Sequence, residues 1–228
     1  MFDETTPHGR IAAAALAIAA ERPWSDVSLR DIATRAGFSL VEMRQHVASK
    51  GDVLAAIVRG FDDEVLAHAP ATEAGEPRRD AVFEVMMARF DAMQPHKAAL
   101  KSIVATSPPD PTLMRAMLAS QAWMLQAAGI DSGGIGGGVR VLGLATVYAS
   151  VFRTWLEDDD PGMARTMAAL DRRLRRGERS LSRLDDIGDV LGKAGGFFSN
   201  VLSGRRTASG EASQPAAPRS GTAPDSTG

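Results

Sequence analysis

The sequence contains no cysteine among its 228 residues. Disulfide bonds, thiolate metal sites and cysteine nucleophiles are therefore excluded. Aromatic residues are scarce, at 5% of the chain, and no strong alternation of apolar and polar residues indicates half-buried strands. Alanine, the strongest helix former, is abundant. Together these features predict an all-α protein with about nine or ten helices.

Long apolar runs and a strong net charge are missing too. No uninterrupted apolar run reaches the ~18 residues needed to span a membrane. Residues 11–20 resemble a signal-peptide core, but acidic residues precede them and Glu21 and Arg22 follow, which favours a soluble helix in a cytoplasmic protein. The net charge is −2, and seven basic residues balance seven acidic ones across residues 1–60. A head that binds DNA must therefore gather its cations on one face.

Motifs of catalysis and metal binding are also lacking. The four histidines lie far apart without metal-ligand spacing, and no Gly-x-Ser-x-Gly or nucleotide-binding fingerprint occurs. The glycine-rich stretch 131–138 has neither the Lys-Ser/Thr nor the preceding strand of a phosphate-binding loop, and is expected to be a plain loop. The acidic turn at 157–160 is expected to cap the next helix. We predict no enzymatic activity, no cofactor and no metal site.

Three helix-capping boxes lie within 25 residues of one another. Each pairs a serine with an acid three positions later: Ser28 with Asp31, Ser39 with Glu42, and Ser49 with Asp52. In such a box the hydroxyl accepts from an orphan helix N–H and the acid bonds back to the cap. The boxes predict helices over 29–36 and 40–47 and a third from 50, with Gly37 ending the first. Two short helices joined by a tight turn form a helix-turn-helix.

The run VSLRDIATRAGFS at 27–39, followed by His46 and by Ser49-Lys50, resembles the DNA-binding domain of TetR-type transcriptional regulators. The resemblance covers about residues 9–66 and implies that the 40–47 helix enters the major groove of operator DNA. Arg44 stands where such regulators usually carry a phosphate-contacting tyrosine, and a cation can make the same contact. The residues expected to contact DNA are Arg30, Ser39, Leu40, Val41, Arg44, Gln45, His46 and Lys50.

Composition divides the chain into four parts. A linker at 69–77 separates a helix-turn-helix head at 1–68 from a larger helical domain at 77–178. The helices expected in this larger domain span about 77–93, 96–106, 111–128, 137–157 and 161–178. Residues 179–203 carry apolar residues at helical spacing and are predicted to form an amphipathic C-terminal helix. The stretch 204–228 is rich in Gly, Ser, Pro, Ala and Thr and is predicted to be a disordered tail.

Methionine and aromatic residues gather in the larger domain. Such soft side chains are typical of apolar pockets, although an ordinary bundle core explains the same pattern. The TetR-type resemblance implies that this domain binds a small apolar effector and pairs into a homodimer through the 137–156 and 161–178 helices. The residues expected to bind the effector are Phe83, Met86, Met87, Phe90, Met117, Trp123, Met124 and Tyr148.

A second interpretation comes from the C-terminal part. The stretches 144–148, 155–160 and 170–173 resemble the lipid-binding proteins of ubiquinone biosynthesis, which share the TetR-type fold without acting on DNA. This resemblance implies a lipid or isoprenoid ligand and a membrane-surface contact through 179–203. The sequence therefore leaves two functions open, a DNA-binding regulator and a lipid-binding protein.

Overall fold

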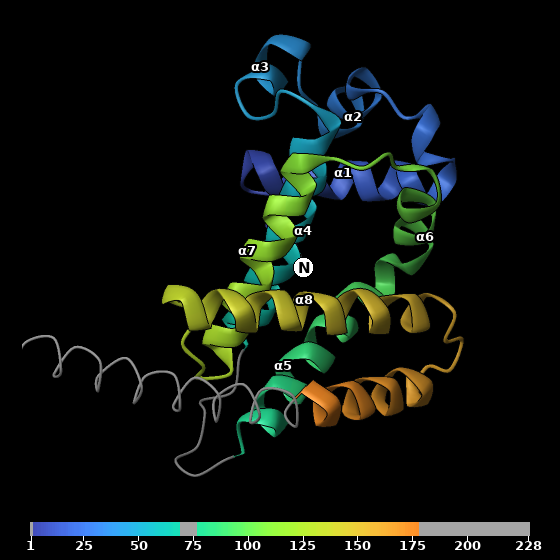
Figure 1. Ribbon diagram of the computed structural model, residues 1–228. Helices are drawn as coiled ribbons and strands as arrows, with labels where there is room; N and C mark the ends of the chain where they lie inside the picture. The colour runs from blue at the N-terminus through green and yellow to red at the C-terminus, as the bar shows by residue number, and fades with distance from the viewer. Residues whose placement is uncertain (1, 69–76, 178–228) are drawn as a thin grey trace, which may run out of the picture. The chain divides into compact units, whose positions relative to one another are not determined.

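The computed structural model describes residues 2–68 and 77–177, and within these ranges the chain is helical and contains no strand (Figure 1). The prediction of an all-α fold is confirmed. The helices are α1 Pro7–Glu21, α2 Leu29–Ala36, α3 Leu40–Arg44, α4 Lys50–Ala67, α5 Arg78–Met93, α6 Lys97–Thr106, α7 Pro111–Ala127 and α8 Gly134–Leu156, with short 3₁₀ turns η1 Trp24–Asp26 and η2 Gln94–His96. Residues 164–177 are also helical. Residues 69–76 of the predicted linker, the predicted helix at 179–203 and the predicted tail lie outside the described residues.

Local signals set the helix starts of the head. The Thr6 hydroxyl accepts from the Gly9 amide at 3.1 Å and Pro7 occupies the first turn of α1, where its missing N–H costs nothing. All three predicted capping boxes are present, with both of their hydrogen bonds, at the starts of α2, α3 and α4. The head therefore begins each of these helices where the sequence indicates.

One predicted helix in the head is shorter than expected. The prediction of a helix over 40–47 was wrong at its C-terminal end, because α3 stops at Arg44. The amides of Gln45 and His46 donate to carbonyls only three residues back, at 3.0 Å each, which tightens the last turn out of α-helical geometry. Val47 is buried just beyond this turn and anchors it in the core.

Two boundaries in the larger domain also differ from the prediction. The loop expected over 131–138 is shorter, because α8 begins at Gly134 after Asp131 accepts from the Gly133 amide at 2.9 Å. The helix expected from 161 begins at residue 164. Its start is capped by the preceding acidic turn, as predicted, since Asp158 accepts from the Thr166 amide at 2.8 Å.

The fourth helix is the centre of the packing. It lies against α1 on one side and against α5 and α7 on others (Figure 1). Its apolar positions are almost fully buried: Val53, Leu54, Ile57, Phe61 and Val65. One hydrophobic cluster runs from α1 through α4 to the 164–177 helix, so the predicted head and the described body share a core.

A buried ion pair crosses this core. The Asp62 carboxylate on α4 accepts from the Arg89 guanidinium on α5 and from the Ser120 hydroxyl on α7, the latter at 2.7 Å. Burial raises the pKa of Asp62, and the two donors act in the opposite direction. Because desolvation penalises both charges, the pair is held by mutual neutralisation and fixes three helices at one point.

One helix in the described ranges, α8, is long and apolar enough to cross a membrane by length and composition. Of its most apolar window 22% is buried. The core helix of a soluble protein passes the same test.

Replacing Arg89 by methionine should leave the Asp62 carboxyl buried without its cation. We expect the free energy of unfolding, measured by urea denaturation at pH 7, to fall by about 3–5 kcal/mol. The double variant Arg89→Met with Asp62→Leu should recover most of this loss, because it removes both charges. A loss below about 1 kcal/mol for the single variant would contradict a structural role for the pair.

Candidate functional site

Two capping boxes hold the helix-turn-helix in shape. At the start of α3 the Glu42 carboxylate accepts from the Ser39 amide at 2.8 Å, while the Ser39 hydroxyl accepts from the Glu42 amide at 3.2 Å. Donation from the Ser39 amide and from the Ser39 hydroxyl to this carboxylate lowers the pKa of Glu42. The same arrangement joins Ser28 and Asp31 at the start of α2. Glu42 is therefore committed to the cap, which explains an acid in a helix predicted to face DNA.

The turn between α2 and α3 is clamped from α1. Gly37 has φ +72° and ψ +33°, a left-handed conformation that suits glycine and ends α2. The Arg10 guanidinium donates to the Ala36 carbonyl at 2.6 Å and lies 4.1 Å from the ring centroid of Phe38. Arg10 was not predicted from the sequence, where it is a lone cation directly before the apolar stretch at 11–20.

Most residues predicted to contact DNA are exposed on or beside α3. Arg30, Ser39, Arg44 and Gln45 are exposed, and the apolar side chains of the set are exposed as well, Leu40 at 44% and Val41 at 74%. His46 is half-buried; its ring centroid lies 5.7 Å from that of His8 and 5.9 Å from that of Phe38. The structure thus brings seven of the eight residues to α2, α3 and the turn after it.

The eighth residue, Lys50, is engaged within the head. Its ammonium donates to the Trp24 carbonyl at 2.6 Å and lies 4.5 Å from the centroid of the Trp24 ring. Burial lowers the pKa of Lys50. These contacts give Lys50 a structural role in joining η1 to the start of α4.

Other cations of the head are also paired internally. Arg22 lies 2.7 Å from the Asp31 carboxylate, and Arg35 lies 2.7 Å from the Glu21 carboxylate. Arg30 and Arg44, both exposed, are the members of the predicted set that present guanidinium groups to solvent. Residues 1–60, whose formal charges balance, can in this way keep cations near α3 while others serve the fold.

Seven of the eight residues predicted to bind the effector belong to the hydrophobic core or pack against it. Met86, Phe90, Met124 and Tyr148 are buried, and the Phe90 and Tyr148 rings stack at 5.7 Å between centroids. The other members of the set are less buried: Phe83, Met87 and Met117 are half-buried, and Trp123 is 56% exposed. None of the eight lines a large hollow found in the described residues.

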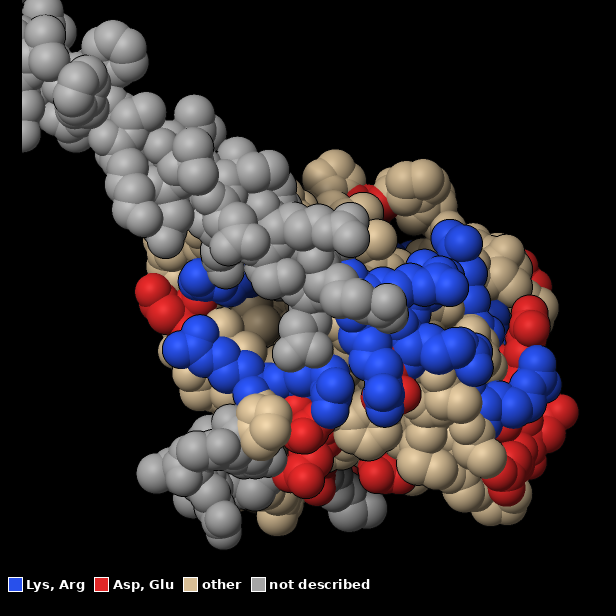
Figure 2. All heavy atoms as spheres, turned by 60° about the horizontal axis from the view of Figure 1, so that its bottom comes forward, with Lys and Arg blue, Asp and Glu red and all other residues tan. Residues whose placement is uncertain are grey.

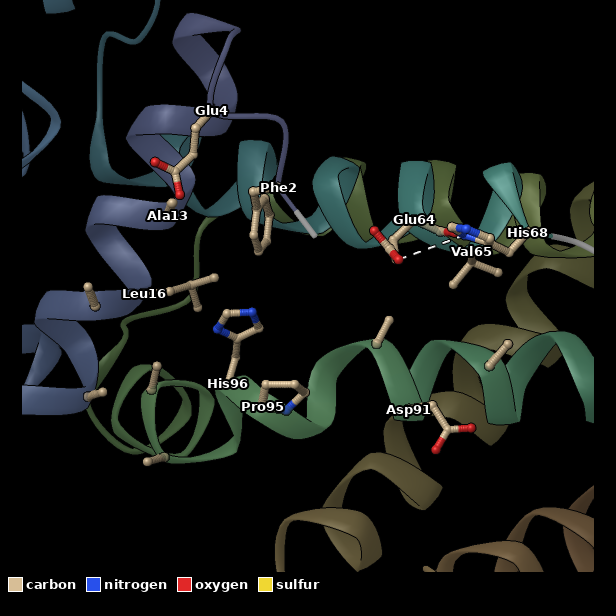
Figure 3. A pocket seen from close by; sticks show the side chains of 16 residues that line it. Phe2, Glu4, Ala13, Leu16, Glu64, Val65, His68, Asp91, Pro95 and His96 are labelled. Atoms are coloured by element: carbon tan, nitrogen blue, oxygen red, sulfur yellow. Dashed lines mark hydrogen bonds and ion pairs between the residues drawn. The ribbon is translucent and has the colours of Figure 1, made fainter.

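That hollow is a cavity of about 920 Å³ between α1 and α4 on one side and α5, η2 and α6 on the other. Seven of its sixteen lining residues are alanines, which come from three helices: Ala13, Ala17, Ala20, Ala88, Ala92, Ala98 and Ala99. In Figure 3 the side chains of Phe2, Leu16 and His96 extend into the space, and Glu64 lies on the α4 side. We call this space the junction cavity, because α1 and α4 belong to the predicted head and α5 and α6 to the body.

Basic side chains gather on another surface. Figure 2 shows Lys and Arg side chains concentrated on the face that comes forward from the lower end of Figure 1. The 164–177 helix contributes exposed arginines in its last turns: Arg172, Arg173, Arg175 and Arg176. Cations at a helix C-terminus complement the helix dipole, and Arg175 also pairs with Asp171 at 2.9 Å.

Lys50→Ala should act on stability through its contacts with Trp24. We expect the free energy of unfolding, measured by urea denaturation, to fall by about 1.5–3 kcal/mol, the usual range for a hydrogen bond to a charged group. The control Arg44→Ala should change stability by less than about 0.5 kcal/mol, because the Arg44 side chain is exposed. Equal effects of the two changes would contradict the structural role of Lys50.

The chain resembles known proteins in its three-dimensional structure. No protein-family model and no curated protein matches the chain. A TetR transcriptional regulator from Rhodococcus sp. RHA1 aligns with a TM-score of 0.59 and 21% sequence identity, over 75% of this chain and 94% of its own. A TetR transcriptional regulator from Nitrosomonas europaea ATCC 19718 aligns with a TM-score of 0.58 and 22% identity, over 76% of this chain and 98% of its own. The helix-turn-helix on α2 and α3 and the helices that follow it thus make up the fold of TetR transcriptional regulators.

Proposed function

We propose that this protein is a cytoplasmic transcriptional regulator that binds operator DNA as a homodimer and is switched by a small effector with an apolar body. The observation that carries the proposal is the helix-turn-helix on α2 and α3. Its turn is fixed by Gly37 and Arg10, and its second helix presents exposed side chains. Two solved structures with the same fold are TetR transcriptional regulators, which supports the same class of function for this chain.

The exposed surface of α3 suits a DNA groove. Arg44 offers a guanidinium to a phosphate, and Gln45 offers an amide that can pair with a base edge. Leu40 and Val41, although apolar, are exposed on the same short helix, and apolar groups contact the methyl group of thymine. We assign Arg30 to a supporting phosphate contact, and His46 to a contact at the end of α3.

The α8 helix supports the homodimer. Its exposed apolar side chains include Ile135 at 92%, Val139 at 45% and Leu142 at 59%, and Met167 on the following helix is 39% exposed. Burial against a second copy would gain roughly 25 cal/mol for each Å² of apolar surface. Pairing of α8 and the 164–177 helix with the same helices of a second copy would therefore bury apolar surface whose exposure to water is unfavourable.

An effector needs space as well as apolar walls. The eight residues predicted from the sequence remain a prediction, and most of them belong to the hydrophobic core or pack against it. The junction cavity offers formed space next to α4, whose first turn follows the helix-turn-helix. A molecule that binds there can favour one arrangement of head and body over another, which is the requirement for switching DNA affinity.

The lipid-binding interpretation keeps one supporting observation, the basic face in Figure 2. Anionic membrane surfaces attract clustered arginines. The predicted membrane contact at 179–203 lies outside the described residues, and the exposed α3 surface has no role in this alternative. We therefore favour the regulator and use DNA binding to decide between the two.

DNA binding is tested by fluorescence anisotropy with duplexes from the region upstream of the protein's own gene, across a series of salt concentrations. We expect sequence-selective binding, and the logarithm of the association constant should fall linearly with the logarithm of the salt concentration. Arg44→Ala should flatten that slope by about 1, because one phosphate contact is lost. The control Arg115→Ala, an exposed arginine on α7, should leave the slope unchanged. Absence of selective binding at low salt, with association to anionic liposomes, would instead support the lipid-binding protein.

The homodimer is tested with a charge in the exposed apolar face of α8. Leu142→Glu should convert the dimer into a monomer in analytical ultracentrifugation, because a carboxylate would be buried in the apolar interface. Val104→Glu is a matched control, since Val104 on α6 is exposed to a similar degree, 52% against 59%. A dimer that both changes leave intact would show that α8 is not the interface.

A further inference from the structure

The junction cavity has walls that the sequence encodes directly. On α1 the alanines at 13, 17 and 20 recur at helical spacing, so they share one face of the helix. On α5 Ala88 and Ala92 also lie one turn apart. Facing helices in a core usually interdigitate large side chains, and methyl groups on both sides leave the space unfilled. The result is a cavity of about 920 Å³, within the usual size range of small-molecule sites.

One end of the cavity is aromatic. The Phe2 ring packs edge-on against Phe61, with centroids 5.1 Å apart, and against His96 at 5.6 Å. Gly60 makes this possible, because a Cβ at that position would collide with the Phe2 ring. Phe2 and His96 line the cavity, and aromatic faces attract cations.

The charged groups that line the cavity are acidic. Three carboxylates, Glu4, Glu64 and Asp91, are among the lining residues, and no Lys or Arg is among them. Glu64 lies 3.7 Å from the His68 ring nitrogen, and its side chain is 35% exposed. In Figure 3 the Asp91 carboxylate points away from the space, whereas Glu64 lies beside it on α4. Burial lowers the pKa of His96, so the His96 imidazole favours its neutral form and does not compete with a bound cation.

We propose that the junction cavity binds a small organic cation with an apolar body, such as a hydrophobic amine or a quaternary onium ion. The methyl-lined walls take the apolar body, and the carboxylates together with the aromatic end take the charge. Because residues of α1 and α4 face residues of α5 and α6 across the cavity, an occupant contacts the predicted head and the body at once. This rests on the proposed function, in which such a molecule is the effector.

The assignment also excludes a ligand class. Fatty acids and other lipophilic anions would bring a carboxylate next to Glu64, where like charges repel. The cavity therefore discriminates by sign of charge as well as by shape. Tetraphenylphosphonium and tetraphenylborate test this directly, since they have nearly the same shape and opposite charge.

Binding of each ion to the full-length protein is measured by isothermal titration calorimetry without DNA. We expect the phosphonium cation to bind at least tenfold more tightly than the borate anion. The variant Glu64→Gln should weaken cation binding roughly two- to fivefold, as expected when one partly exposed charge pair is lost. The control Asp63→Asn removes an exposed carboxylate one position before Glu64 on α4 and should have no effect. Equal affinity for the two ions, or no effect of Glu64→Gln, would overturn the proposal.

Shape is tested separately from charge. Ala17→Trp places a large ring in the cavity from α1 and should weaken cation binding at least tenfold. Ala119→Trp, at an exposed alanine on α7 that does not line the cavity, is the control. Circular dichroism shows whether both variants fold. If Ala17→Trp does not fold, the Glu64→Gln variant tests the assignment. Unchanged binding by a folded Ala17→Trp variant would overturn the assignment to this cavity.

The regulatory role is separated from the site by adding the cation to the protein–DNA complex. Release of DNA by wild type at a lower cation concentration than by the Glu64→Gln variant is the expected result. Cation binding that leaves DNA affinity unchanged would keep the site and overturn its role as effector site. Selective DNA binding without any cation binding would overturn the site and leave the proposed regulator standing.

Discussion

The buried pair of Asp62 and Arg89 is the interaction on which the arrangement of the helices depends. Asp62 lies on the helix that follows the helix-turn-helix, Arg89 on the first helix of the body, and Ser120 on α7 completes the set. Neither charge can remain buried without the other, so α4 cannot move away from α5 without a large energetic cost. Motion between head and body is therefore expected to pivot near this pair.

The junction cavity lies on the same two helices, α4 and α5, further along the chain on each. Glu64 follows Asp62 by two residues, and Asp91 follows Arg89 by two. A ligand that occupies the space between α4 and α5 would favour one spacing of these helices, which the ion pair holds together at Asp62 and Arg89. Ligand binding and the position of the head would thus be coupled, because the ion pair stays in place while the spacing of α4 and α5 next to it changes. Coupling of this kind requires only a difference in ligand affinity between two arrangements.

The charge balance of the head has a structural explanation. Arg10 clamps the turn, Lys50 bonds to Trp24, and Arg35 pairs with Glu21, so much of the positive charge serves the fold. The exposed cations beside α3 are Arg30 and Arg44. The net charge of a sequence therefore does not predict the charge of the surface that would contact DNA, because a count of charges does not tell which of them are paired within the molecule.

The sequence by itself determined the all-α fold, the helix-turn-helix and its three capping boxes, because caps and glycine turns depend on residues only a few positions apart. It did not determine that Lys50 bonds to Trp24 or that Arg10 reaches the Ala36 carbonyl, since both contacts join residues 26 positions apart. It also pointed to methionines and aromatics for the effector, whereas the large cavity lies among alanines. Large side chains fill the space around them, and only the tertiary structure decides where small ones face each other and leave room.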